Sequence, residues 1–167
     1  MKGIIAVSGL PGVGKSFFAR HLAEKLKAAY LSTDTLRKEI IPSRTYSEKE
    51  KTLVYNELVN RINALEDKDW IVVDATFHKN ENRARVEEIA QKKGVRLFWI
   101  KVTASEETIR ERVSKPRPDS DANFAVYQKI KEAFEDFQTP VLILNSDHQS
   151  VDSMIWESLI YTGNERG

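Results

Sequence analysis

A glycine-rich turn near the start of the chain has the residues and the spacing needed to hold a polyphosphate. Residues 9–16 read GLPGVGKS, which fits the pattern G-x-x-x-x-G-K-[ST]. Glycines at positions 9, 12 and 14 let consecutive backbone N–H groups approach phosphate oxygens closely. Lys15 adds a positive charge at the β- and γ-phosphates, and the Ser16 hydroxyl is suited to ligate Mg²⁺. We therefore predict a nucleoside triphosphate site formed by Gly9, Gly12, Val13, Gly14, Lys15, Ser16 and Phe17.

A carboxylate and a guanidinium follow a short strand predicted at 30–32. Asp34 and Arg37 stand three residues apart, which makes them neighbours on the first turn of a helix. Ligands of open α/β sheets bind at the carboxyl ends of the strands, so this pair is a candidate site. The alternative is that Asp34 caps the helix and does nothing else.

A second acidic residue ends the apolar run Trp-Ile-Val-Val at 70–73. Asp74 completes a Walker B pattern, in which the carboxylate holds the water shell of Mg²⁺ or acts as a base. Thr76 continues the same edge and is a candidate for binding phosphate or a metal-bound water. The alternative for Asp74 is a turn residue at the end of a strand. His78 also lies near this edge, where we expect it to be solvated or held by structural hydrogen bonds.

A basic segment interrupted by prolines lies in the last third of the chain. Arg110, Arg112, Lys115 and Arg117 fall within eight positions, and two prolines at 116 and 118 stop a continuous helix. We interpret residues 110–122 as a helix–loop–helix lid that closes over the transferred phosphoryl group, with Arg112 and Arg117 as its catalytic arginines. The alternative is a solvated basic turn.

The elements that position these residues alternate between strand and helix. Apolar runs predict strands at 4–7, 30–32, 70–74, 95–102 and 141–145. Apolar residues at helical spacing predict helices at 15–29, 48–66, 80–93, 121–137 and 151–161. This order predicts one α/β domain over residues 1–167, a doubly wound, five-stranded parallel sheet with helices on both faces.

Several side chains carry an expectation about burial. We expect Trp70, Trp99 and Trp156 in the core, together with Val126, Ile130, Phe134 and Phe137 of the helix at 121–137. We expect Arg83 and Arg85 to be exposed.

The composition excludes several classes of chemistry. The 167 residues include no cysteine, so disulfides, thiolate metal sites and cysteine nucleophiles are ruled out. The formal net charge is +1, which gives no overall field that recruits nucleic acid or anionic membrane. Neither a signal-peptide pattern nor an apolar stretch near 18 residues is present. We expect a cytoplasmic protein without a membrane partner.

Taken together, the chain resembles the P-loop kinases of the nucleotide-kinase type. It is most similar to the subgroup that contains polynucleotide 5′-hydroxyl kinases, zeta-toxin kinases and predicted AAA-type kinases. The resemblance spans nearly all of the chain and rests on GLPGVGKS at 9–16, STDTLR at 32–37, VVDAT at 72–76 and the arginine-rich lid.

The resemblance implies a mechanism. It implies that Asp34 is the general base on an acceptor hydroxyl, that Arg37 binds a phosphate of the acceptor, and that Arg112 and Arg117 contact the donor phosphates. The cofactors are then ATP and Mg²⁺, with Ser16 and Asp74 at the metal and Lys15 at the transferred group. The substrate-binding residues are Arg37, Arg44 and Thr76.

The acceptor stays open at this point. We take a 5′-hydroxyl polynucleotide end or a nucleotide-like molecule as the best guess, and a sugar acid, a nucleoside or an antibiotic hydroxyl as the alternative. A third reading, from another class, is a nucleotide-gated switch or an ATPase without an acceptor. Guanine recognition usually needs Asn-Lys-x-Asp after a late strand, and here that place reads Asn145-Ser146-Asp147, without the lysine.

Overall fold

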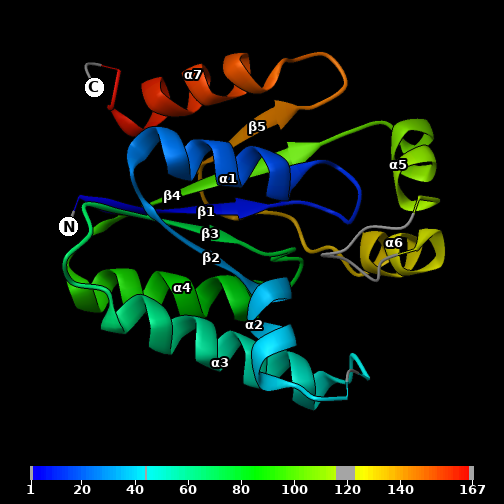
Figure 1. Cartoon of the computed structure of the whole chain (residues 1–167), viewed down its shortest axis with the longest axis horizontal. Helices are drawn as coiled ribbons and strands as arrows, with labels where there is room; N and C mark the ends of the chain where they lie inside the picture. Colours follow the sequence, from blue (N-terminus) through cyan, green and yellow to red (C-terminus); the bar gives the residue numbers. More distant parts are fainter. Residues whose placement is uncertain (1, 44, 116–122, 166–167) are drawn as a thin grey trace.

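A computed structural model describes residues 2–43, 45–115 and 123–165. Its centre is an all-parallel sheet of five strands in the order β2-β3-β1-β4-β5 (Figure 1). The strands are β1 (Gly3–Ser8), β2 (Ala29–Ser32), β3 (Trp70–Asp74), β4 (Arg96–Thr103) and β5 (Val141–Asn145). The predicted fold class is confirmed.

Helices cover both faces of the sheet. The helices are α1 (Lys15–Leu26), α2 (Thr33–Ile40), α3 (Glu48–Ala64), α4 (Asn80–Lys93), α5 (Glu106–Val113), α6 (Phe124–Glu132) and α7 (Val151–Thr162). Figure 1 shows α1 and α7 on one face and α3 and α4 on the other. None of the helices in the described part of the chain is long and apolar enough to cross a membrane.

The central strand β1 is buried on both faces, which explains its continuous apolar sequence. Ile5 and Val7 join the core beneath α1 and α7, whereas Ile4 and Ala6 join the core beneath α3 and α4. This alternation follows from the two-residue period of a strand. Two apolar cores therefore pack against the sheet, one on each face.

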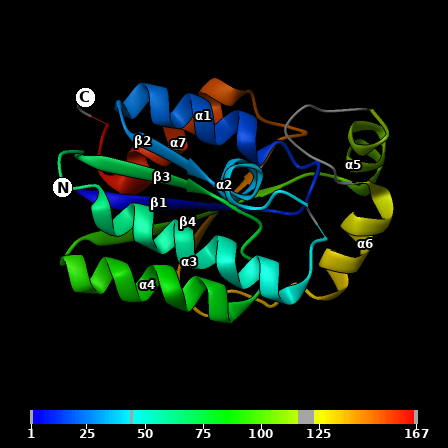
Figure 2. The ribbon, with the colours of Figure 1, turned by 60° about the horizontal axis from the view of Figure 1, so that its bottom comes forward.

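The carboxyl ends of the strands share one edge, and the remaining helices gather beyond it. Figures 1 and 2 show α2, α5 and α6 at this end of the molecule, while both termini lie at the opposite end. The register pairs Ser32 of β2 with Asp74 of β3, and Asp74 with Val7 of β1. Residues that follow β1, β2 and β3 are thereby brought to one place.

Four expectations about burial and helix length are wrong. Trp156 is 56% exposed, because α7 packs through Met154, Ser158 and Leu159 instead. Arg83 is 3% exposed, since it donates hydrogen bonds to backbone carbonyls that lie far away in the sequence. The helix predicted at 121–137 ends at Glu132, and Val126 on it is 38% exposed.

Candidate functional site

The turn after β1 is shaped to receive phosphate oxygens. Gly12 and Gly14 have φ values of 86° and 89°, a left-handed conformation that side chains rarely adopt. Gly9 is needed for a different reason, because a Cβ there would lie 2.7 Å from Val13 Cγ2 and 2.8 Å from the Val102 carbonyl oxygen. The turn therefore excludes side chains at all three glycines and fits a bound polyphosphate.

Helix α1 begins directly behind this turn. Gly14 is its N-cap residue and supplies no side-chain hydrogen bond, so the first N–H groups of α1 face the turn. The aliphatic part of Lys15 passes over Gly9, where its Cδ would lie 3.6 Å from an added Cβ. Val13 is buried, whereas the Phe17 ring is 60% exposed and lies against His21. Of the predicted ATP-binding residues, Phe17 thus directs its side chain away from the turn.

Asp74 lies beside the turn at the end of β3 and is almost fully buried. Its Oδ2 accepts a hydrogen bond of 2.6 Å from the Tyr30 hydroxyl of β2. Burial, followed by the charge of Asp74 and this hydrogen bond, raises the pKa of Tyr30, so the phenol stays a donor. The Ser8 hydroxyl donates to the Thr76 carbonyl at 2.7 Å and ties the edge after β3 to the start of the turn.

The polar groups beside the turn match the ligands of Mg²⁺ better than the ligands of a metal ion held entirely by side chains. Among the described residues there is no group of three or more His, Cys, Asp or Glu side chains that could hold an ion. Mg²⁺ is typically held by one or two protein oxygens, substrate phosphates and water. One hydroxyl, Ser16, and one carboxylate, Asp74, next to a phosphate-binding turn meet that requirement.

Asp34 stands in the first turn of α2 and is not its cap. The N-cap residue is Ser32, and the Asp34 carboxylate points to Arg37, with Oδ1 3.3 Å from Nη1. The Asp34 side chain is 39% exposed, whereas that of Arg37 is 11% exposed. An acidic group in the first turn is also favoured by the helix dipole. The Asp34 carboxylate is therefore partly accessible at the carboxyl edge of β2.

Tyr55 of α3 connects the two predicted acceptor-side regions. Its buried hydroxyl accepts from the Phe77 N–H at 3.4 Å and also bonds the Thr76 side chain. Burial raises the pKa of Tyr55, while the nearby Arg37 and Asp34 act on it in opposite directions. Asp34, Arg37 and Thr76 thus gather around one phenol.

His78 lies at the same edge, largely buried. One of its ring nitrogens, Nδ1, lies 3.2 Å from Thr76 Oγ1. Burial, and then the charges of Lys51 and Lys79, lower the pKa of His78 to about 4. The imidazole is therefore neutral at physiological pH and acts as a hydrogen-bonding partner of Thr76.

Arg112 of α5 reaches the back of the phosphate-binding turn. Its Nη1 donates to the Gly12 carbonyl at 3.2 Å and to Ser146 Oγ at 3.1 Å. Ser146, just after β5, donates in turn to the Val13 carbonyl at 2.6 Å. Helix α5 and the segment after β5 are thereby hydrogen-bonded to the turn. Arg44 and Arg117, and the part of the predicted lid at 116–122, lie outside the described residues.

Sequence patterns did not reveal four residues that shape the site. Ser146 could have been suspected, because it follows a strand at the ligand-binding edge. Tyr30 and Tyr55 carried no signal, since aromatic residues in strands and helices are usually core, and Glu50 had only the spacing of a helix cap. Their roles arise from contacts between segments that lie far apart in the chain.

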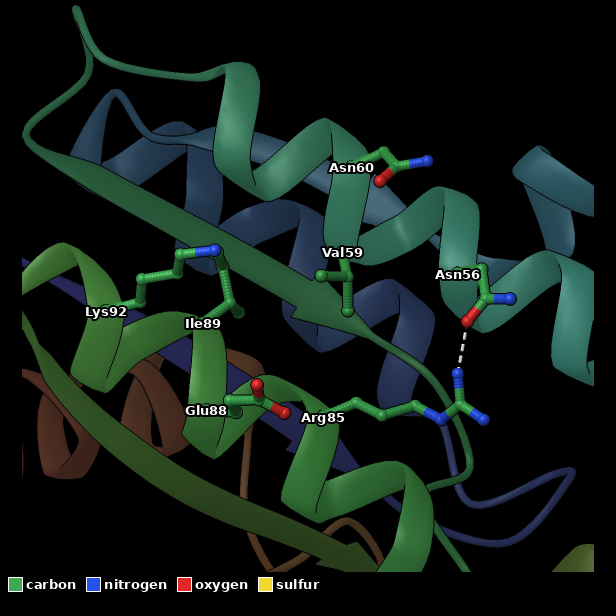
Figure 3. Close-up of a pocket in the computed structure, with 7 residues that line it drawn as sticks. All are labelled: Asn56, Val59, Asn60, Arg85, Glu88, Ile89 and Lys92. Atoms are coloured by element: carbon green, nitrogen blue, oxygen red, sulfur yellow. Dashed lines mark hydrogen bonds between the residues drawn. The ribbon is translucent and has the colours of Figure 1, made fainter.

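A surface groove of about 440 Å³ lies between α3 and α4. Figure 3 shows Asn56, Val59 and Asn60 of α3 across from Arg85 and Glu88 of α4, with Arg85 hydrogen-bonded to Asn56. None of the predicted site residues lines it.

A family comparison agrees with this geometry. Residues 4–137 match the model of a family described as AAA domain. The chain belongs to that family. The match begins in β1 and includes the phosphate-binding turn, the Asp34–Arg37 pair and Asp74, and it ends after α6.

Solved structures with the same fold include kinases of small molecules. A gluconokinase from Sinorhizobium meliloti 1021 is 20% identical, with a TM-score of 0.73, over 96% of this chain and 91% of that chain. An APS kinase from Mycobacterium tuberculosis, solved with AMPPNP and APS, is 21% identical, with a TM-score of 0.73, over 95% and 96%. A sugar kinase from Janibacter sp. HTCC2649 is 16% identical, with a TM-score of 0.74, over 98% and 95%. At these identities the likeness shows a P-loop kinase fold.

Proposed function

We propose that this chain is an ATP- and Mg²⁺-dependent kinase that transfers the γ-phosphoryl group to a hydroxyl acceptor. The observation that carries the proposal is the partly exposed Asp34 carboxylate on the same sheet edge as the glycine-rich turn. A base facing a triphosphate site is the arrangement that phosphoryl transfer to an alcohol requires.

The roles of the residues follow from their places. Asp34 orients the acceptor hydroxyl and takes its proton as the hydroxyl oxygen bonds to the γ-phosphorus. The bond from the γ-phosphorus to the bridging oxygen breaks, and ADP leaves with that oxygen. Lys15, with Arg112 and Arg117 of the lid, stabilises the charge on the transferred group. Ser16 and Asp74 would hold Mg²⁺, which would supply charge neutralisation at the phosphates.

The acceptor class has two candidates. A 5′-hydroxyl polynucleotide end or a nucleotide-like acceptor follows from the Asp34-x-x-Arg37 pattern, with Arg37, Arg44 and Thr76 on the acceptor side. A small-molecule hydroxyl is supported by the gluconokinase and the sugar kinase among the solved structures of the same fold. Radiolabelled ATP with a panel of 5′-hydroxyl oligonucleotides, sugar acids, nucleosides and aminoglycosides distinguishes them.

We expect Asp34→Ala and Lys15→Ala each to abolish transfer, for different reasons. Asp34→Ala removes the base and leaves ATP affinity within about twofold of the wild type, since it lies on the acceptor side. Lys15→Ala removes a charge at the β- and γ-phosphates and weakens ATP binding itself. Steady-state kinetics and calorimetric titration with ATP measure the two effects. Equal turnover by the Asp34→Ala enzyme rules out the base role, and ATP hydrolysis insensitive to every acceptor indicates an ATPase instead.

A further inference from the structure

Glu50 is an unusual residue in the first turn of α3, because its carboxylate is buried. It is 4% exposed, whereas its neighbours Glu48 and Lys49 are exposed. A buried glutamate is rare unless it is paired, since removing a charge from water costs several kcal/mol. The hydrogen-bond and ion-pair partners of Glu50 therefore indicate why its carboxylate is buried.

One oxygen of Glu50 fixes the segment that precedes α3. Oε2 accepts three hydrogen bonds, from the Thr45 N–H at 2.7 Å, the Thr45 hydroxyl at 3.1 Å and the Tyr46 N–H at 3.0 Å. Tyr46 has a φ of 56°, which is uncommon for a residue with a side chain. Burial alone raises the pKa of Glu50, but these bonds and the charge of Arg37 outweigh it and lower the pKa. Glu50 is ionised and holds a strained turn.

Helix capping does not explain the position of the other carboxylate oxygen of Glu50, Oε1. Ser47 and Glu50 have the S-x-x-E spacing of a capping box, and Ser47 Oγ accepts from the Glu50 N–H at 3.2 Å. A capping box uses a single carboxylate oxygen. Oε1 lies instead 3.3 Å from Arg37 Nε, in an ion pair whose two side chains are 5% and 11% exposed.

Arg37 is consequently held between two carboxylates. Nε lies 3.3 Å from Glu50 Oε1 as an ion pair without a hydrogen bond, Nη1 lies 3.3 Å from Asp34 Oδ1, and the centre of the Tyr46 ring lies 5.0 Å from Cζ. Asp34, Arg37 and Glu50 together carry a net charge of −1.

We propose that Glu50 is a positioning residue for phosphoryl transfer, holding Arg37 so that Arg37 fixes the Asp34 carboxylate toward the acceptor. The inference rests on the proposed function, with Asp34 as its base. It gives Arg37 a role at Asp34 that is separate from the binding of a phosphate on the acceptor.

The kinetic test compares Glu50→Gln with Glu48→Gln. Both variants remove one negative charge from the first turn of α3, but Glu48 is exposed and pairs only with Lys51 among the described contacts. For Glu50→Gln we expect kcat to fall at least about 10-fold because the base is misplaced, with KM and ATP affinity within about twofold. Glu48→Gln should match the wild type. The acceptor is the member of the panel that the wild-type enzyme phosphorylates. An unchanged kcat in Glu50→Gln, or a loss shared by Glu48→Gln, overturns the proposal.

A second measurement needs no acceptor and therefore separates this proposal from the proposed function. The ¹⁵N relaxation of Arg37 Nε should report a rigid side chain in the wild type and in Glu48→Gln, and a loss of that rigidity in Glu50→Gln. Equal rigidity in all three proteins overturns the inference even if transfer is observed. Absence of transfer with the expected loss of rigidity overturns the proposed function and keeps the Glu50–Arg37 pairing.

Arg37→Lys covers the case in which Glu50→Gln does not fold. Lysine keeps the positive charge but presents one ammonium, which cannot face both carboxylates as a guanidinium does. We expect a similar loss in kcat, by the same factor for acceptors with and without a phosphate group. A loss confined to KM of phosphorylated acceptors assigns Arg37 to acceptor binding and overturns the positioning role.

Discussion

At the scale of single residues, the Tyr30 hydroxyl controls how Asp74 faces the phosphate-binding turn. Its hydrogen bond occupies Oδ2 of Asp74 and leaves Oδ1 for other partners. Groups that orient a metal-binding carboxylate typically change metal affinity 10- to 100-fold when they are removed. Tyr30 is therefore a determinant of how the proposed Mg²⁺ site binds.

We expect Tyr30→Phe to raise the Mg²⁺ concentration needed for half-maximal ATP binding by about 10-fold. Calorimetric titrations of ATP at a series of Mg²⁺ concentrations measure this. Tyr161→Phe is the matched control, since that phenol lies on α7 against Phe98. Identical Mg²⁺ dependence in the two variants would contradict a role for Tyr30 at Asp74.

His78 makes the stability of the protein depend on pH. Its pKa is about 4 in the folded state, against about 6.5 in an unfolded chain, because burial and then Lys51 and Lys79 oppose its charge, while Glu48 favours it and Arg83 opposes it. The unfolded state therefore binds more protons between these two values. The contribution of His78 to stability is intact above pH 6.5 and is lost as the pH falls toward 4.

For the wild type we expect the free energy of unfolding to fall by about 2 kcal/mol more than in His78→Gln between pH 6.5 and 4, after allowance for partial hydration. Urea denaturation at several pH values measures this difference. His148→Gln, at an exposed position, should keep the wild-type slope. A His78→Gln protein with that same slope would show that His78 titrates normally.

At the scale of elements, Arg83 joins three segments that the sequence separates. From α4 it donates Nε to the Phe77 carbonyl at 2.7 Å, Nη1 to the Asp136 carbonyl at 3.0 Å and Nη2 to the Glu135 carbonyl at 2.5 Å. Its Cζ also lies 3.7 Å from the centre of the Phe137 ring. Arg83 thus fixes the connection between α6 and β5 to the turn after β3.

We expect Arg83→Ala to lower the free energy of unfolding by about 3 kcal/mol, because it leaves several carbonyls without their donor. Arg85→Ala, two residues along the same helix, removes a bond to Asn56 at the surface and should cost less than about 1 kcal/mol. Midpoints of urea denaturation compare the two. Similar losses in both variants would show that the hydrogen bonds of Arg83 to the backbone carbonyls do not stabilise the fold.

The elements of the fold also show which features could be predicted from the sequence and which could not. The strands, their parallel direction and the glycine-rich turn were predictable, because apolar runs that alternate with helical patterns and a specific motif are local signals. The burial of Arg83 was not, since its acceptors lie 52 and 53 residues away in the chain. Trp156 was misplaced for a related reason, since the face that α7 buries depends on α1, which the sequence of α7 does not encode. The burial of Glu50 could not be predicted either, because a glutamate on a helix is usually solvated and only the folded chain places the Thr45 and Tyr46 N–H groups around it.

At the scale of the whole molecule, the parallel arrangement explains why the candidate site lies at one end. Every strand delivers its carboxyl end to the same edge, so the turn after β1, Asp34 after β2 and Asp74 at the end of β3 meet without any long loop. Helices α5 and α6 lie beyond the same edge (Figure 1). The proposed donor and acceptor sites would thus be built from neighbouring strands of one sheet.

The outermost strand β5 has a consequence for the protein at high concentration. It ends the sheet order, and Ile143 on it is 60% exposed. An open strand edge with an apolar side chain is a template for pairing with a second chain. A net charge of +1 gives little long-range repulsion between copies near neutral pH. Aggregation in concentrated solutions should therefore begin at β5, on the side of the sheet farthest from Asp34, and light scattering should rise most steeply near the pH of zero net charge.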